Sequence, residues 1–376
     1  MRGSTDRQMT ICTVVDPGDL IPDQHPIRRV RPFVESALTR LEPTFEEMYA
    51  KVGRPSIPPE QLLKASVLMA LYSIRSERQF CERLQYDLLF KWFLGLNVQD
   101  PAFDATSFSK NRERLMDNMV SKLFFQAVLE EARQQRLLSN QHFTVDGTLL
   151  ESWASLKSLE RKPNLGGQQK RKRRRGGGPK GPRDGNRNPE VNWRGEKRSN
   201  QTHQSKTDPE ARLARKGAVP AKLCYAGHVL MENRNGLIVD VELTEAHGRA
   251  ERETGLRMLH RLGRKKGRMT VGADKGFDSK DFVQGCRELG VTPHIAQNTT
   301  RFRGGSAIDG RTVKRAGYAL SQRMRKRIEE IFSWVKTVGG GRRLRFIGRR
   351  RNQLWVEITG AAFNLVRRSN LVPRPA

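Results

Sequence analysis

The sequence predicts an α/β protein, a mixed sheet with flanking helices, preceded by an all-α N-terminal domain. Through about residue 138 the apolar residues recur at helical spacing. From about residue 142 to 296, short β-type runs alternate with helical segments. Within this second half, a basic stretch of low complexity interrupts the pattern. Alternating strands and helices are typical of a mixed sheet covered by helices.

The N-terminal domain, residues 1–138, contains helical patterns only. One helix is expected within about 27–56, and Pro58 and Pro59 open another, because proline suits a first helical turn. Asp104 precedes a further helix as a candidate N-cap. A long amphipathic helix over about Met119–Arg136 closes the domain.

The second domain, residues 139–370, carries the predicted sheet. Strands are expected at His142–Val145, ending at Asp146, and at Met269–Ala273, ending at Asp274. A hairpin and another strand complete the sheet, at 223–231, 237–243 and 292–296. The helical segments fall at 249–263, 279–289, 321–337 and 354–368.

A basic insertion, residues 160–215, interrupts this domain. Its centre reads Lys170-Arg171-Lys172-Arg173-Arg174-Arg175, followed by three glycines. The insertion contains few apolar residues, and the little apolar surface it could bury cannot offset the entropy lost when the chain becomes ordered. We therefore expect the insertion to be flexible unless a partner orders it.

The formal net charge of +30 points to a polyanionic partner. No apolar run is long enough to span a membrane, and the N-terminus lacks the apolar core of a signal peptide. The 4 cysteines form no Cys-x-x-Cys pair, so neither a disulfide framework nor a zinc site is indicated. These features favour a cytoplasmic protein.

Three carboxylates fall where a metal site needs them. Asp146 and Asp274 each follow a strand, and Glu329 lies on a later helix. Such hard oxygen ligands suit Mg²⁺ or Mn²⁺, and two such ions can drive phosphodiester chemistry. On a helical wheel Glu329, unlike Glu330, borders the apolar face. An ordinary i,i+4 pair of Arg325 with Glu329 is the alternative, and taken alone it is favoured.

These residues resemble the motifs of bacterial insertion-sequence transposases of the DDE class. Arg325-x3-Glu329-x6-Lys336 is similar to the Y-x2-R-x3-E-x6-K signature of that group. Val145-Asp146-Gly147-Thr148 and Gly272-Ala273-Asp274-Lys275-Gly276 resemble its two aspartate motifs, and residues 55–115 resemble its helical N-terminal domain. Gln322 stands where the signature has tyrosine, which puts in doubt the role usually given to that residue.

The resemblance implies an RNase H-like catalytic domain, a helical DNA-binding domain, and a homodimer on double-stranded DNA. Asp146, Asp274 and Glu329 would bind two Mg²⁺ or Mn²⁺ ions and catalyse cleavage at terminal inverted repeats and strand transfer into target DNA. A bacterial, nucleoid-associated location follows. The residues expected to contact DNA are Arg325, Lys336, Trp153, Arg342, Arg343, Arg345, Arg349, Arg350, Lys172, Arg173 and Arg174.

Several alternatives remain open. Trp153 is at least as well explained as a packing residue. The whole chain can also be a catalytically silent repressor derived from a transposase, or a nuclease without strand transfer. An RNA-binding protein explains the charge but leaves the ordered carboxylates unexplained.

Overall fold

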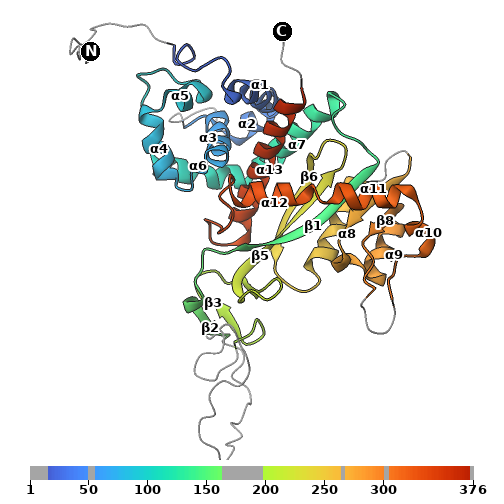
Figure 1. Cartoon of the computed structure of the whole chain (residues 1–376). Helices are drawn as coiled ribbons and strands as arrows, with labels where there is room; N and C mark the ends of the chain where they lie inside the picture. The colour runs from blue at the N-terminus through green and yellow to red at the C-terminus, as the bar shows by residue number, and fades with distance from the viewer. Residues whose placement is uncertain (1–15, 50–55, 163–197, 264–266, 300–304, 373–376) are drawn as a thin grey trace, which may run out of the picture.

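A six-stranded mixed sheet organises the second half of the chain (Figure 1). The computed structural model describes residues 16–49, 56–162, 198–263, 267–299 and 305–372. The order β4-β5-β1-β7-β8 is joined by β6, which pairs with β5. These strands are β1 (His142–Glu151), β4 (Arg212–Ala214), β5 (Lys222–Glu232), β6 (Ile238–Glu245), β7 (Met269–Ala273) and β8 (Val291–Ile295).

Strand β1 continues beyond the point predicted. It pairs antiparallel with β5 from Phe143 to Glu151, whereas its parallel pairing with β7 ends at Thr144, opposite Gly272. The expectation that Asp146 ends the first strand is therefore wrong, because β5 carries the pairing past it. Beyond Thr144 the two parallel strands separate, and we call the opening between them the β1–β7 fork.

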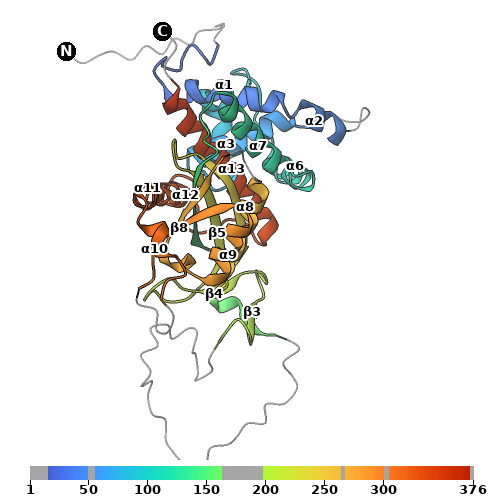
Figure 2. The same cartoon turned by 90° about the vertical axis from the view of Figure 1, so that its right-hand side faces the viewer.

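Helices cover both faces of the sheet (Figure 2). On one face α8 (Ala250–Leu262) and α9 (Lys280–Glu288) pack on Phe143, Val145 and Val271. Residues of opposite parity in these strands face α11 (Ala316–Arg325) and α12 (Ile328–Lys336), and α13 (Arg349–Leu371) packs on β6. The single helix expected at 321–337 is thus two helices, divided at Lys326 and Arg327, and α10 (Gly310–Val313) precedes them.

The N-terminal part is helical, as predicted. Asp104 caps its helix, because its carboxylate accepts a hydrogen bond from the Ser107 backbone N–H at 2.9 Å. The helix expected at 27–56 is instead two short helices. The elements are α1 (Pro26–Thr39), α2 (Glu42–Met48), α3 (Pro59–Leu71), α4 (Glu77–Tyr86), α5 (Leu88–Leu94), α6 (Ala105–Asp117) and α7 (Val120–Gln134).

One hydrophobic core joins the helical part to the sheet. It runs from Val34 in α1 through Phe124 in α7 to Leu365 in α13, and includes Val241 of β6. Helix α13 is in contact with α1, α3, α7 and β6, so the two halves of the chain share this helix as a common support. The sheet is thereby fixed relative to the N-terminal helices.

Helix α13 also closes the exposed edge of β6. The Asn364 side-chain amide accepts from the Ile238 backbone N–H at 2.9 Å and donates to the Ile238 carbonyl at 2.7 Å. Farther along the same edge, the Gln353 side-chain amide accepts from the Leu243 N–H and donates to the Val241 carbonyl. Side-chain amides thus satisfy the backbone groups that an edge strand would leave open to another chain.

Residues at both ends of the insertion predicted to be flexible, 160–215, form strands. β2 (Leu159–Arg161) and β3 (His203–Ser205) form a two-stranded sheet, and β4 pairs with β5. The side chain of Asn200 holds both the N–H and the carbonyl of Leu213, at 2.7 and 2.8 Å. Lys172, Arg173 and Arg174 lie outside the described residues.

Replacing Gly341 by alanine is expected to destabilise the protein by about 2–3 kcal/mol. A Cβ at this position would lie 2.3 Å from Cη2 of the buried Trp355 ring and 2.9 Å from the Val335 carbonyl oxygen. That carbonyl accepts the Gly341 N–H, so neither neighbour can give way cheaply. Urea unfolding measures the change. Gly248→Ala is the control, because a Cβ there meets nothing within 4 Å.

Candidate active site

The β1–β7 fork brings the two predicted aspartates together. Thr144 pairs with Gly272, so Asp146 and Asp274 each stand two residues beyond the last aligned pair of the parallel strands. The Asp146 carboxylate accepts from the Gly147 N–H at 2.7 Å, and that of Asp274 accepts from the Gly276 N–H at 2.8 Å. The second bond caps the short 3₁₀ turn Lys275–Phe277 and fixes the side chain of Asp274 at the strand end.

Repulsion between the two carboxylates is visible in their electrostatics. Burial raises the pKa of Asp146, and the negative charge of Asp274 raises it further. The Gly147 N–H and the positive charges of Lys216 and Arg325 act in the opposite direction. A divalent cation between the carboxylates would relieve both the burial and the repulsion.

Glu329 does not join the two aspartates directly. It lies in the first turn of α12, is exposed, and is separated from Arg325 by the break between the helices. Ile328, Ile331 and Val335 are buried as the helical wheel predicts, but Glu330 is exposed as well. Within the described residues, no three Asp, Glu, His or Cys side chains stand at metal-binding distance. The predicted triad is therefore not assembled as a metal-binding group in this structure.

The two cations of the signature lie on either side of this break. Arg325 ends α11 and donates to the Gln322 side chain at 3.3 Å, so the ordinary pair with Glu329 is not formed. Lys336 ends α12, and its ammonium donates to the Thr148 hydroxyl at 2.5 Å. Burial lowers the pKa of Lys336, and the nearby charge of Lys216 lowers it further. Lys336 thus brings a positive charge to β1 two residues beyond Asp146.

Gln322 has a structural role in this chain. Its side-chain amide donates to the His294 carbonyl of β8, and the Tyr318 hydroxyl donates to the Ile295 carbonyl at 2.9 Å. Both side chains therefore attach α11 to β8. Tyr318 is thereby held against the end of β8.

The sequence analysis overlooked Glu251 and Lys216. Glu251 is the second residue of α8. A Cβ added at Gly147 would lie only 2.7 Å from the Cγ of Glu251. The Lys216 ammonium donates to the Gly147 carbonyl at 3.3 Å. Neither residue carries a motif that separates it from its charged neighbours; only the glycine next to Asp146 hints at a close approach to this strand.

Trp153 and Arg343 form an exposed pair beside the end of β1. The guanidinium of Arg343 lies 5.3 Å from the centre of the Trp153 ring and donates to the Trp153 carbonyl at 2.7 Å. Trp153 is 49% exposed, so one side of its ring remains available for stacking. The Leu344 N–H donates to the Glu151 carbonyl, which attaches this segment to β1.

The other arginines of the basic run occupy different surroundings. Arg342 is exposed. Arg349 and Arg350 lie in the first turn of α13, 3.7 Å from Glu210 and 2.8 Å from Asp117 respectively. Arg345 instead donates to the Ile74 carbonyl at 3.2 Å and lies against the Phe346 ring, and burial lowers its pKa to about 10. The prediction that Arg345 contacts DNA does not suit this location, because its guanidinium joins two parts of the chain.

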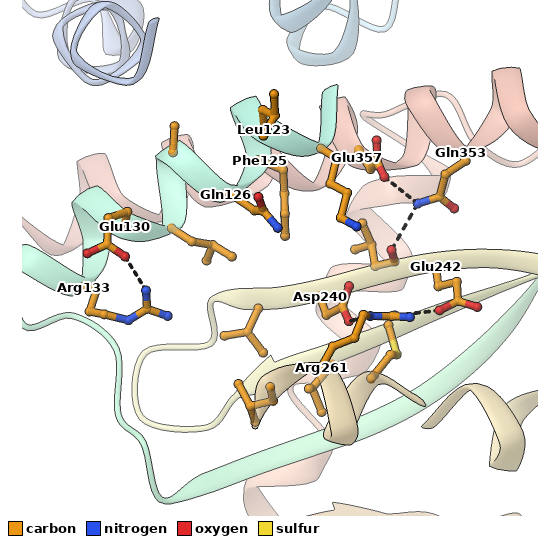
Figure 3. A pocket seen from close by; sticks show the side chains of 18 of the residues that line it. Leu123, Phe125, Gln126, Glu130, Arg133, Asp240, Glu242, Arg261, Gln353 and Glu357 are labelled. Atoms are coloured by element: carbon orange, nitrogen blue, oxygen red, sulfur yellow. Dashed lines mark hydrogen bonds and ion pairs between the residues drawn. The ribbon is translucent and has the colours of Figure 1, made fainter. Parts of the chain in front are cut away.

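A hollow lined by polar groups lies elsewhere in the described residues. A groove of about 900 Å³ separates α7 from β6 and α8, and paired charges line it (Figure 3). Arg261 binds Asp240 and Glu242, Arg133 binds Glu130, and Gln353 binds Glu357. These polar groups satisfy one another, whereas the carboxylates in the β1–β7 fork repel one another. The fork is therefore the better candidate for chemistry.

Two family models match parts of the chain. A family model described as "Transposase domain (DUF772)" matches residues 15–114, and one described as "Transposase DDE domain" matches residues 194–365. Asp274 and Glu329 lie within the second match and Asp146 lies outside both. No protein with a curated description matches the chain.

A solved structure with a remote likeness is entitled "Cryo-EM structure of piggyBac transposase synaptic complex with hairpin DNA (SNHP)". It is 11% identical with a TM-score of 0.40, covering 92% of this chain and 75% of that one. That likeness is too remote to support a conclusion about this chain. The two family models do support one, since both describe transposase domains and together they span the N-terminal helices and most of the sheet. Because both models name transposase domains and the second names the DDE class, the chain belongs to the transposases of the DDE class.

Proposed function

We propose that this transposase binds the terminal inverted repeats of its insertion sequence and catalyses metal-dependent cleavage and strand transfer. The observation that carries the proposal is the meeting of Asp146 and Asp274 in the β1–β7 fork. The order of the sheet supports an RNase H-like core, since antiparallel β1, β5 and β6 are followed, after α8, by β7 and β8 parallel to β1.

The donor set fits Mg²⁺ or Mn²⁺, because both prefer carboxylate oxygens. Asp146 and Asp274 would hold two ions, with Glu329 completing the site from the first turn of α12. Such ions activate a water or hydroxyl nucleophile and stabilise the leaving oxygen of a phosphodiester. DDE transposases as a family generally use divalent metal ions.

The chain's own residues would position the DNA. Arg325 at the end of α11 and Lys336 at the end of α12 neutralise the phosphates beside the aspartates. Trp153 stacks on a base near the cut, with Arg342 and Arg343 on the adjoining backbone. Arg349 and Arg350 extend this basic surface onto α13, and Lys172, Arg173 and Arg174 add contacts from the insertion.

The reaction proceeds in two displacements without a covalent enzyme intermediate. Water attacks the phosphodiester at the end of the repeat, and the 3′ oxygen leaves with a proton. This 3′-hydroxyl then attacks a phosphodiester of the target DNA, joining the element to the target and releasing a target 3′-hydroxyl. Two element ends must be held together during these steps, so we expect a homodimer on DNA.

A labelled duplex that carries the repeat flanking this gene tests the proposal. Mg²⁺ or Mn²⁺ should support cleavage and joining to a plasmid target, whereas EDTA should prevent both. Tight binding without cleavage under any metal would instead favour the silent repressor. Cleavage without joined products would favour a nuclease that lacks strand transfer.

Glu329→Gln is expected to abolish cleavage, whereas Glu330→Gln should retain at least half of the wild-type cleavage rate. The two glutamates are adjacent, exposed and in the same helical turn, so each variant is the control of the other. Initial rates of cleavage at saturating Mg²⁺ measure the difference. The opposite order of effects would assign the third carboxylate to Glu330.

A further inference from the structure

Glu251 approaches the fork from the face of the sheet opposite α12. Alternation along β1 places Val145 and Gly147 toward α8, and Thr148 toward Lys336 of α12. Glu251 lies in the first turn of α8 directly over Gly147. A Cβ at position 147 would be 2.7 Å from Cγ and 3.0 Å from Oε1 of Glu251. Glycine at this position is therefore what allows the Glu251 carboxylate to rest against β1.

The Glu251 carboxylate lies among other charged groups, and its hydrogen-bonding capacity is not met within the described residues. Among the described residues, no hydrogen bond and no ion pair within 4 Å is formed by its half-buried carboxylate. Burial raises the pKa of Glu251, Lys216 opposes this, and the negative charges of Asp146 and Asp274 add to the rise. Glu251 therefore shares one electrostatic environment with both aspartates. A half-buried carboxylate in such a position is costly unless it gains a partner.

We propose that Glu251 is a further carboxylate of the divalent-metal site. It reaches the fork from α8, while α12 carries Glu329 on the other face, so the ions are held between the two layers of helices. This inference rests on the proposed function, since it adds a residue to the same site. Asp146 on β1 and Asp274 just after β7 supply ligands from the sheet, and the negative charges of both act on the Glu251 carboxylate.

Two simpler explanations for Glu251 can be separated from this one. An acidic residue in a first helical turn interacts favourably with the helix dipole, but Glu253 has the same advantage and is about half exposed. Glu251 can alternatively serve only to hold Lys216 beside the Gly147 carbonyl, as a contact for a DNA phosphate. In that case its loss would weaken DNA binding without affecting metal binding.

Calorimetric titration of the full chain with Mn²⁺, without DNA, tests the proposal. Glu251→Gln should weaken Mn²⁺ binding at least about tenfold, the lower end of the loss expected around a metal site. Glu253→Gln should bind Mn²⁺ as the wild type does. Gly147→Ala should also weaken binding, because its methyl group displaces Glu251 while every carboxylate is retained. Melting temperatures of all variants establish that each one is folded.

Asp274→Asn and Lys216→Gln make the outcomes distinct. If Asp274→Asn abolishes Mn²⁺ binding while Glu251→Gln binds normally, the inference about Glu251 is wrong and the proposed function stands. If Asp274→Asn also binds normally, the proposed metal site itself fails. If Glu251→Gln and Lys216→Gln weaken DNA binding equally and neither alters Mn²⁺ affinity, Glu251 is a positioning residue for Lys216, and the inference is likewise overturned.

Discussion

Asparagine in place of Asp146 is expected to reduce metal-dependent cleavage roughly a thousandfold or more. Metal ions stabilise such transition states by several kcal/mol, and each ~1.4 kcal/mol is tenfold in rate. The same change should not weaken the fold. Burial and Asp274 raise the pKa of Asp146, so the ionised carboxylate is disfavoured in the folded protein at neutral pH. Asparagine removes that charge and keeps the size of the side chain.

This combination separates a catalytic role from a structural one. Initial cleavage rates and urea unfolding are measured on the same preparations, with a gel-shift assay for binding to the terminal repeat. Asp240→Asn is the matched control, because Asp240 is a β-strand carboxylate with a raised pKa that is paired with Arg261 away from the fork. Cleavage at the wild-type rate by Asp146→Asn would remove Asp146 from the site, whatever happens to Asp274.

The sequence was sufficient to predict what depends on local chemistry. Asp104 caps its helix because the carboxylate needs only the backbone three residues on. Asp274 follows a short buried strand whose end is marked by a change from apolar to polar residues. The same reasoning failed at Asp146, since the length of β1 is set by β5, about 80 residues away in the chain. Pairing of that kind leaves no local signal.

The arrangement around the proposed metal site could not be predicted from the sequence for the same reason. No proline or glycine marks the division between α11 and α12, so a helical wheel drawn through it placed Arg325 and Glu329 on one continuous face. Glu251 and Glu253 look alike in sequence, and only the packing of α8 over Gly147 distinguishes them. Arg345 was predicted to bind DNA because it lies in a run of arginines. The charge of that run does not reveal that the Arg345 guanidinium lies between two parts of the chain.

Alanine in place of Glu131 is expected to destabilise the protein by about 3–5 kcal/mol, the usual cost of leaving a buried charge unpaired. Glu131 of α7 accepts from the Ser36 hydroxyl at 2.5 Å and from Arg40 at 3.1 Å in α1, and from Arg368 of α13 at 3.1 Å. Arg368 is only 3% exposed, so without Glu131 its charge remains buried. Glu130→Ala is the control, because Glu130 forms an exposed pair with Arg133.

The pH dependence of this effect has a definite sign. Burial alone would raise the pKa of Glu131, but hydrogen bonds from Ser36, Arg40 and Arg368 outweigh burial and lower it below the usual 4.5. The carboxylate therefore contributes its full stability above about pH 4.5 and loses it as the pH falls through the lowered value. The difference in the free energy of unfolding between wild type and Glu131→Gln, measured by urea unfolding, should therefore become smaller as the pH falls.

The shape of the unfolding curve matters as much as its midpoint. Glu131 ties α1 and α7 to α13, and α13 in turn closes the edge of β6, so the N-terminal helices and the sheet share one core. We expect Glu131→Ala to unfold in a single transition at a lower urea concentration. Two separate transitions would mean that the halves are stable independently. A single one means that the N-terminal helices keep a fixed position relative to Asp146 and Asp274. The proposed in-line attack on one chosen phosphodiester requires such a fixed position of any helices that bind the DNA.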